Sequence, residues 1–212
     1  VDLKKLEPRQ ETQVNYRELW QVTDEQFFVL YSGNLGKKQN LDLLLDVADE
    51  LKGDDDIKFI VVGEGVLKSH LLERMDHKNL QNVSLHPLQP YEQLGDLLRS
   101  ANLHLVLQSS DVEDLVMPSK LTSILAVGGT SLLTAHEDTE LGRLLEKSPN
   151  LGYLVVPDDR EALKNGILKA KSHWMQKGKT MGENPEAKEY AKEHLDRHQV
   201  IESFVEALQA RC

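Results

Sequence analysis

Cysteine is almost absent from this sequence of 212 residues, since the single one, Cys212, stands at the last position. No disulfide can form within the chain, which excludes the small disulfide-stapled scaffolds and is typical of a reducing compartment. Long apolar runs are lacking too, because none approaches the roughly 20 residues that a membrane-spanning helix needs. The chain starts with Val1 rather than Met, as expected for a piece of a longer protein.

Positive charge is also scarce. The chain has 25 Lys and Arg against 35 Asp and Glu, which gives a net charge of −10 and a pI near 5.3. Nonspecific nucleic-acid binding requires a basic face, so this composition argues against a nucleic-acid partner. It argues equally against a polybasic protein that lies on a membrane surface.

What the sequence does contain is a regular alternation of short apolar runs and helical patterns. Such alternation predicts parallel strands with right-handed crossovers, in an α/β, Rossmann-like, doubly wound sheet. Ligands on such sheets bind beyond the carboxyl ends of the strands, so the loops that follow the strands are the candidate sites. The expected strands are 27–32, 57–63, 83–85, 103–107, 131–134 and 152–156, and the expected helices are 41–51, 66–75, 91–100, 118–127, 138–146 and 161–174.

The pattern divides the chain into three parts. Residues 1–25 are charged and irregular, so we expect a lead-in between domains that adds no core element. Residues 26–176 hold the alternating elements and are expected to form the ligand-binding domain. Residues 177–212 open with a polar break and continue as a helix over 186–210, which should pack across the domain or on a neighbour.

The most informative run is Met117–Leu121, Met-Pro-Ser-Lys-Leu, which follows an acidic loop. Pro118 fixes its own φ and favours the start of a helix, and helix-forming residues follow up to Gly128. The N-terminus of that helix presents free backbone N–H groups and the positive end of the helix dipole, which together attract anions. Ser119 adds a hydroxyl there and Lys120 adds a cation. An ordinary helix of the sheet is the alternative interpretation.

Two further loops follow predicted strands and contain glycines. The first, Gly33–Asn40, lets its backbone approach a ligand, and Lys37 and Lys38 can neutralise phosphate, although the Walker and G-x-G-x-x-G spacings are absent. A plain turn between strand and helix with two solvated lysines is an equal alternative. The second, Gly63–Gly65, permits tight packing. We favour a structural role for it over a contact between Glu64 and a ligand hydroxyl.

The acidic loop and one histidine pair are the candidates for metal binding. Asp111, Glu113 and Asp114 have carboxylates that can accept sugar or ribose hydroxyls or bind a divalent ion, and a solvated acidic loop is the alternative interpretation. His194 and His198 stand one helical turn apart, a spacing that can form a zinc site, but the glutamate of H-E-x-x-H is missing. A solvated surface is the favoured interpretation of that pair. We expect no metal site and no Ser-His-Asp or Cys-His arrangement.

Taken in order, several segments resemble the C-terminal domain of the retaining GT-B glycosyltransferases of family 4, also called group 1. The likeness covers residues 1 to about 209 and includes Val1-Asp2, Tyr31–Gly36, Phe59–Gly65 and Pro118–Gly128. The last segment is similar to the family pattern Pro-Ser-Lys-Leu-x-Glu-x-Met-Ala-x-Gly. The forms Gly-Asn-Leu-Gly and Val-Met-Pro-Ser-Lys-Leu look most like enzymes of colanic-acid and other exopolysaccharide assembly.

This resemblance implies a binding site for a nucleotide diphosphate sugar, either a UDP- or a GDP-sugar, with no further cofactor. Lys37, Lys38, Lys120 and the helix N-terminus at Ser119 would stabilise the leaving diphosphate, and the loop at Pro87-Leu88 would lie against the base. The implied donor-site residues are Gly33, Asn34, Lys37, Lys38, Gln39, Gly63, Glu64, Pro87, Leu88, Glu113, Asp114, Pro118, Ser119, Lys120, Leu121 and Ser123.

The first loop departs from the family pattern. Where the family often has Arg and Lys to hold the donor diphosphate, this chain has Asn34 and Gln39. Lys37 or Lys38 would then have to supply the positive charge.

The pair of glutamates typical of the family is missing as well, because its two positions fall on Leu115 and Ser123. Glu113 or Asp114 would replace the first glutamate. Ser123 or Thr122 would hold the ribose hydroxyls in place of the second.

The resemblance implies that the full-length protein transfers a sugar, with retention, from a nucleotide diphosphate sugar to a glycan or lipid-linked acceptor in polysaccharide biosynthesis. The acceptor site and the catalytic histidine of the family lie in an N-terminal domain that is missing here, so no catalytic residue is expected and this chain alone should be inactive. A cytoplasmic location is implied, and peripheral association at the inner face of the plasma membrane stays open. A GT-B sugar-nucleotide epimerase domain and a degenerate, non-catalytic partner domain are the alternatives.

Overall fold

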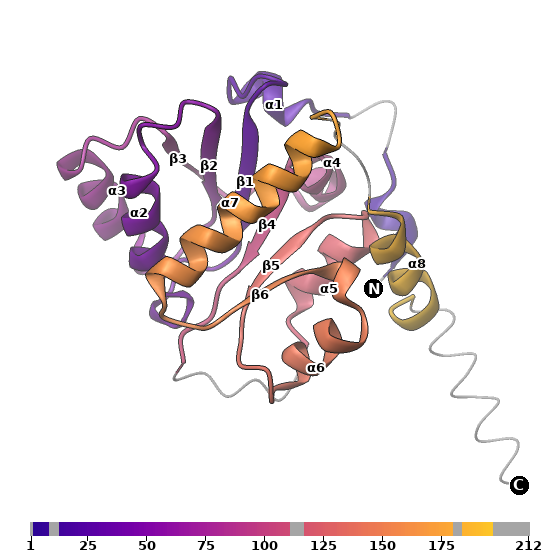
Figure 1. Ribbon diagram of the computed structural model, residues 1–212. Helices are drawn as coiled ribbons and strands as arrows, with labels where there is room; N and C mark the ends of the chain where they lie inside the picture. Colours follow the sequence, from indigo (N-terminus) through magenta and orange to yellow (C-terminus); the bar gives the residue numbers. More distant parts are fainter. Residues whose placement is uncertain (1, 9–12, 111–116, 180–183, 197–212) are drawn as a thin grey trace, which may run out of the picture.

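The computed structural model describes residues 2–8, 13–110, 117–179 and 184–196 of the chain. Its centre is a sheet of six parallel strands in the order β3-β2-β1-β4-β5-β6, with helices on both faces (Figure 1). This order, which reverses its direction between β1 and β4, confirms the predicted α/β, Rossmann-like, doubly wound sheet. The strands are β1 Phe27–Ser32, β2 Ile57–Val62, β3 Val83–His86, β4 Leu103–Val106, β5 Ser131–Thr134 and β6 Gly152–Val155.

The helices that connect the strands lie close to their predicted positions. Most boundaries differ by one or two residues, and the predicted helix over 91–100 begins with a 3-10 turn, Tyr91–Gln93, before α4 starts. The connecting helices are α2 Leu41–Glu50, α3 Lys68–His77, α4 Leu94–Ser100, α5 Ser119–Ala126, α6 Glu140–Lys147 and α7 Arg160–Gln176.

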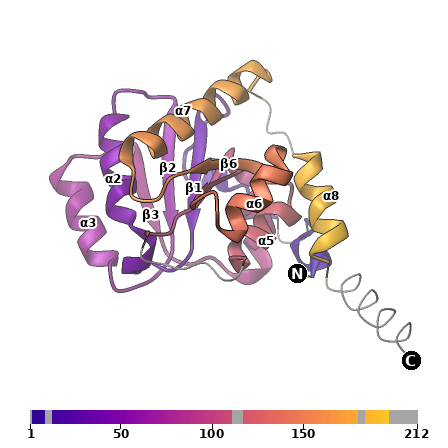
Figure 2. The same ribbon diagram turned by 60° about the horizontal axis from the view of Figure 1, so that its bottom comes forward.

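The sheet separates two hydrophobic cores. Phe27, Val29 and Tyr31 of β1 belong to the core that α2, α3 and α7 cover. Phe28 and Leu30 belong to the opposite core, which α4, α5 and α6 cover, and Figure 2 shows α5 and α6 together on one side of the sheet. Successive side chains of a strand point to opposite faces, and here both faces are buried. The central strands therefore read as continuous apolar runs in the sequence.

The lead-in contributes to the second core, so the expectation that residues 1–25 add no core element is wrong. Leu6 of the 3-10 turn Leu3–Leu6, Tyr16 of the short helix α1 (Tyr16–Leu19) and Val22 expose 4% of their surface or less. These anchors occur singly between polar residues. They therefore leave no periodic pattern that sequence reasoning can detect.

Arg17 fastens the lead-in to the start of the sheet. Its guanidinium donates to the carbonyl of Ser100 at 3.0 Å and to the side chain of Asn102 at 3.2 Å. It also donates to the carbonyls of Thr23 and Gln26 at 2.7 and 2.6 Å. Burial lowers the pKa of Arg17, and the carboxylate of nearby Asp24 opposes this effect. A buried arginine with this many backbone acceptors holds several segments in register.

The helix predicted over 186–210 is present in part, as α8 (Pro185–His194). Its residues Ala187 and Ala191 are fully buried, and it packs against α5 on the same side of the sheet (Figure 2). Residues 197–212 lie outside the described residues. The division at residues 26–176 and 177–212, and contact of the last segment with an N-terminal domain, remain predictions.

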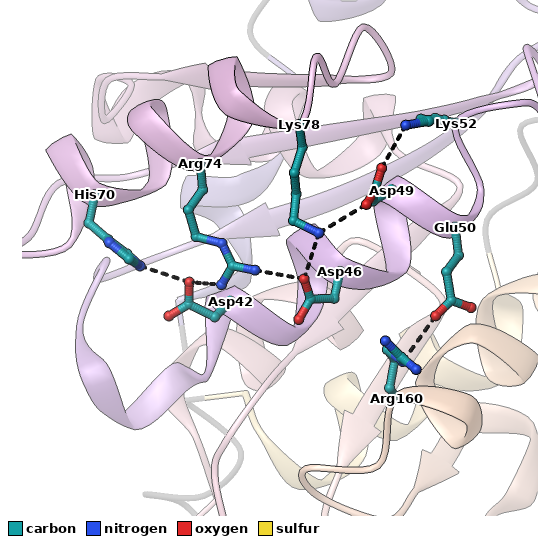
Figure 3. A network of polar contacts seen from close by, with 9 residues as sticks. All are labelled: Asp42, Asp46, Asp49, Glu50, Lys52, His70, Arg74, Lys78 and Arg160. Atoms are coloured by element: carbon teal, nitrogen blue, oxygen red, sulfur yellow. Dashed lines mark hydrogen bonds and ion pairs between the residues drawn. The ribbon is translucent and has the colours of Figure 1, made fainter.

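Acidic residues of α2 pair with basic residues of neighbouring helices (Figure 3). Arg74 of α3 bridges Asp42 and Asp46, and Lys78 lies 3.0 Å from Asp46 and 2.9 Å from Asp49. Each partly exposed ion pair contributes less than about 1 kcal/mol to stability. Together the pairs hold α3 beside α2, and α2 is the helix that directly follows the loop after β1. The other members of the network are Glu50, Lys52, His70 and Arg160.

Candidate functional site

The loops that follow β1 and β2 are joined at the carboxyl ends of the strands, beside the point where the strand order reverses. The N–H of Gly33 donates to the carbonyl of Val62 at 2.9 Å, and the N–H of Leu35 donates to the carbonyl of Glu64 at 2.9 Å. A switch point of this kind leaves a crevice between loops that run to opposite sides. The predicted donor-site residues of these two loops therefore lie together.

Lys120, the second residue of α5, reaches the first of these loops. Its amine lies 4.7 Å from the centre of the Tyr31 ring, and it would lie 3.3 Å from a Cβ placed on Gly33. The hydroxyl of Tyr31 donates to the carbonyl of Asn34 at 2.8 Å, which fixes the ring beneath the loop. Residues of the first loop and of the Pro-Ser-Lys run are thus brought together, as the sequence predicts.

The charge of Lys120 is not balanced by a carboxylate among the described residues. Burial lowers the pKa of Lys120 to about 8. Burial likewise raises the pKa of Tyr31, so its ring stays neutral. An ammonium group that is removed from water without a counter-charge is unfavourable, and a bound anion would supply the missing partner.

The first turn of α5 adds to this positive region. Pro118 stands at the N-cap, and in the part of the chain that the structure describes no side chain caps the turn. Ser119 is exposed, and Ser123 is partly exposed one turn later. Leu121 is a core residue that exposes only 1% of its surface, so any ligand contact of Leu121 would have to involve its backbone.

The loop after β1 forms the 3-10 turn Lys37–Gln39. Both lysine side chains are exposed, and neither forms an ion pair with another described residue. The side chains of Asn34 and Gln39 both approach Gly36, because a Cβ there would lie 2.7 Å from the Asn34 amide nitrogen and 3.0 Å from Gln39 Oε1. Gln39 Oε1 is buried without a hydrogen-bond partner among the described residues.

The glycines after β2 have the structural role that the sequence analysis favours. A Cβ on Gly63 would lie 2.0 Å from the carbonyl oxygen of Gly33, and one on Gly65 would lie 2.5 Å from that of Leu35. Their hydrogen atoms allow the second loop to pack directly on the first. Glu64 is exposed and accepts a hydrogen bond from Lys68 at 2.7 Å, so its contact with a donor hydroxyl remains a prediction.

Pro87 and Leu88 follow β3 and are both exposed, with 57% of Leu88 accessible. The preceding residue, His86, stacks on Trp20 of the lead-in with ring centres 4.3 Å apart. Burial lowers the pKa of His86. Sequence reasoning missed this stack, since the two rings are 66 positions apart (86 − 20) and no local pattern relates them.

Glu113, Asp114 and Leu115 lie outside the described residues, so their positions stay predictions. Sequence reasoning missed Asp158, which follows β6. Its carboxylate accepts from the Asn40 side chain at 2.6 Å and from the Ser110 N–H at 2.8 Å. The only sequence signal was a turn-forming Asp-Asp pair before α7.

One hollow in the described surface lies elsewhere. It has a volume of about 1490 Å³ and follows the outer edge of β6 between α6 and α7, as far as Phe27 and Thr130 at the amino ends of their strands. None of the predicted donor-site residues that the structure describes lines it. Because ligands of doubly wound sheets bind at the carboxyl ends, we do not assign this hollow to the site.

Neither a metal cluster nor a membrane span occurs in the described ranges. No group of three or more His, Cys, Asp and Glu side chains there is placed to hold a metal ion. His194 ends α8 and is exposed, and His198 lies outside the described residues. Every described helix is too short or too polar to cross a bilayer.

Comparison with known proteins agrees with this geometry. The model of the family described as Glycosyl transferases group 1 matches residues 13–188. A glycosyl transferase named for colanic acid biosynthesis, WcaI of Escherichia coli (strain K12), is 40% identical over 184 residues. That alignment covers 87% of this chain but 43% of the relative, so the chain spans less than half the length of the relative.

Solved structures show the same fold. One is Alr3699/HepE of Anabaena, solved in complex with UDP-glucose. The match covers 99% of this chain and 56% of the Alr3699/HepE chain, with a TM-score of 0.77 and 16% identity. Another is the sucrose-phosphate synthase of Thermosynechococcus elongatus. The match covers 100% of this chain and 52% of the synthase chain, with a TM-score of 0.74 and 16% identity. Such low identity supports the fold alone. The family match and the 40% identical relative show more: this chain belongs to the group 1 family of glycosyl transferases.

Proposed function

We propose that this chain is the donor-binding domain of a retaining glycosyltransferase, which transfers a sugar from a UDP- or GDP-sugar to a glycan or lipid-linked acceptor in polysaccharide biosynthesis. Family membership and a relative named for colanic acid biosynthesis support this proposal. So does the reversal of strand order between β1 and β4, because doubly wound sheets bind ligands at such a point. The acceptor site and the catalytic groups would belong to the remainder of a longer, cytoplasmic protein.

The observation that carries the proposal is the amine of Lys120 at the start of α5, which lies beside Gly33 and has no carboxylate partner among the described residues. In a glycosyl transfer the bond between the anomeric carbon and the diphosphate oxygen breaks, and negative charge builds up on the diphosphate. With the diphosphate bound beside Gly33, the ammonium group of Lys120 and the N–H groups at the start of α5 would stabilise this charge without rearrangement. Lys37 and Lys38 are exposed on the adjoining turn and would add to the attraction.

A nucleotide titration followed by NMR tests this proposal. We expect UDP or GDP to shift the amide signals of Gly33–Gln39 and Ser119–Leu121 in a saturable way, and the nucleotide that binds identifies the base. Lys120→Met should weaken that binding at least tenfold, because a charged hydrogen bond to phosphate is worth about 1.5–3 kcal/mol. Lys147→Met is the matched control, since Lys147 is exposed at the far end of α6.

If this chain binds no nucleotide, the same titration with a chain extended to the length of the relative shows whether the other half is needed for binding. If neither nucleotide shifts any signal at millimolar concentration, in this chain or in the extended protein, the donor-site proposal is wrong. Binding only by the extended protein would mean that the other half completes the site, as the proposal allows.

The degenerate partner domain is the second candidate, favoured by the replacement of family residues by Asn34, Gln39 and Ser123. It predicts no nucleotide binding by the extended protein. Product analysis with the extended protein separates a transferase from an epimerase, because only a transferase links the sugar to an acceptor.

A further inference from the structure

Two residues with left-handed backbone conformations face each other in loops at the carboxyl ends of the strands. Asn40 (φ 42°) ends the turn after β1, and Asp158 (φ 58°) follows β6. Their side chains meet in a hydrogen bond of 2.6 Å from the Asn40 amide to Asp158 Oδ1. The two loops come from strands that are not neighbours in the sheet, since β4 and β5 lie between β1 and β6.

The second carboxylate oxygen of Asp158 holds a third loop. Oδ2 accepts the N–H of Ser110, which follows β4, at 2.8 Å. The N–H of the preceding residue, Ser109, donates to the carbonyl of Lys38 at 2.8 Å. The contacts thus form a closed ring that runs from Asp158 through the loop after β4 to the Lys37–Gln39 turn, and returns through Asn40.

We propose that Asp158 is a positioning residue of the donor site: its carboxylate ties the loops after β1 and β4 to the loop after β6 and so sets where Lys38 and its turn face the ligand. This inference rests on the proposed function. Asp158 lies outside the donor-site residues that the sequence predicts, and it is expected to touch no nucleotide. Its effect on binding would pass through the backbone of the other two loops.

The backbone conformation supports a dedicated role. A left-handed conformation at a residue other than glycine is unfavourable, although Asn and Asp tolerate it best. It persists where surrounding contacts compensate for it. Here the compensation comes from the hydrogen bonds to Asp158, which outweigh the effect of burial and hold the pKa of its carboxyl below the ordinary value. His136, in the loop after β5, adds a favourable electrostatic interaction.

The test uses Asp158→Gly, because glycine adopts a positive φ without strain while it removes the carboxylate. The melting temperature should therefore stay close to that of the wild type, but hydrogen exchange at the Ser110 amide should become at least tenfold faster. The affinity for the nucleotide that the wild type binds should fall about tenfold. Asp158→Asn keeps an acceptor oxygen, and asparagine tolerates the left-handed conformation. This variant should therefore retain part of the Ser110 protection and part of the nucleotide affinity that Asp158→Gly loses.

Asn79→Gly is the matched control. Asn79 also has a positive φ, 51°, and its side chain accepts a hydrogen bond from Gln81, but it lies at the end of α3. This variant relieves the same backbone strain and should leave both Ser110 exchange and nucleotide affinity unchanged. Asn40→Gly should resemble Asp158→Gly in affinity and add little to it in the double variant, because both break the same ring.

Two results would overturn the inference. One is unchanged exchange at Ser110 in Asp158→Gly, which would mean that the carboxylate does not hold the loop. The other is faster exchange with unchanged nucleotide affinity, which would mean that the ring does not position the site. A wild type that binds neither UDP nor GDP would refute the proposed function instead, and the exchange measurement would still decide whether Asp158 holds the loops.

Discussion

Gly63 packs so closely against Gly33 that a Cβ on Gly63 would lie 2.0 Å from the Gly33 carbonyl oxygen. The obstacle is backbone that is itself fixed, since the Gly33 N–H donates to the carbonyl of Val62. The loop after β1 therefore takes its position from the loop after β2. A change at Gly63 should therefore also displace Gly33 and the other residues of the loop after β1.

Gly63→Ala should destabilise the fold by about 2 kcal/mol, because the added methyl group must displace the backbone of the first loop. Gly53→Ala is the control, since a Cβ at Gly53 meets no atom within 4 Å. Denaturation by urea measures both variants. Equal stability of the two would show that the first loop yields to the methyl group without cost.

Nucleotide affinity should depend on pH above neutrality through Lys120. Burial lowers the pKa of Lys120 to about 8, so the amine loses its proton as the pH rises through that value. Only about a tenth of the free sites would be charged at pH 9, and affinity for the diphosphate should fall by up to tenfold between pH 7 and 9. Isothermal titration of wild type and Lys120→Arg gives the comparison, because arginine stays charged throughout this range. A flat profile in the wild type would contradict the prediction.

Arg17→Met should destabilise the domain by about 3 kcal/mol or more. The methionine keeps apolar contacts but removes the donor to the carbonyls of Ser100 and Gln26, whereas the Thr23 carbonyl still accepts the N–H of Gln26. Leu19→Ala in the same helix should cost far less, because 58% of the Leu19 surface is already exposed. Thermal and chemical unfolding test the pair. A small effect of Arg17→Met would mean that water replaces the lost donor.

His104 of β4 should make the fold sensitive to mild acid. It is buried, with 1% of its surface exposed, and burial lowers its pKa to about 4, against a weaker opposing hydrogen bond with the Leu98 backbone. The unfolded chain takes up this proton near pH 6.5 and the folded chain only near pH 4. Stability should therefore fall by about 3 kcal/mol as the pH drops across that window.

His104→Asn removes the titration, so its free energy of unfolding should change less between pH 6.5 and 4 than that of the wild type. Lowered carboxyl pKa values, such as that of Asp42, act at more acidic pH and are common to both proteins. Identical pH slopes in the two proteins would show that His104 does not carry the effect.

The sheet could be predicted from the sequence because its signals are local. The apolar runs of β1 and β2 and the helix that follows Pro118 each depend on residues near one another in the chain. The alternation of strand and helix then leaves few possible topologies. The same reasoning placed Gly33 in the loop after the first strand and Lys120 at a helix N-terminus, and the structure brings the two together.

The missed contacts depend on pairs that are distant in the sequence. The contacts of Arg17 with Asn102 and of Trp20 with His86 form only when the sheet brings these residues together. None of the four residues belongs to a periodic sequence pattern. Asp158 and Asn40 likewise read as ordinary turn residues until their two loops are placed side by side. Composition and spacing contain no information on such meetings, which tertiary packing decides.

The hydrogen bond from Arg17 to Asn102 also affects when the N-terminal part of the domain can fold during synthesis. The two residues are separated by 85 positions. At about 5–20 residues per second, the ribosome makes Asn102 roughly 4 to 17 s after Arg17. During that interval the arginine lacks two of its acceptors and β1 lacks its neighbour β4. The N-terminal end of this domain is therefore made first and folded late, so the nascent chain is most exposed to proteolysis and mispairing before residue 102 emerges.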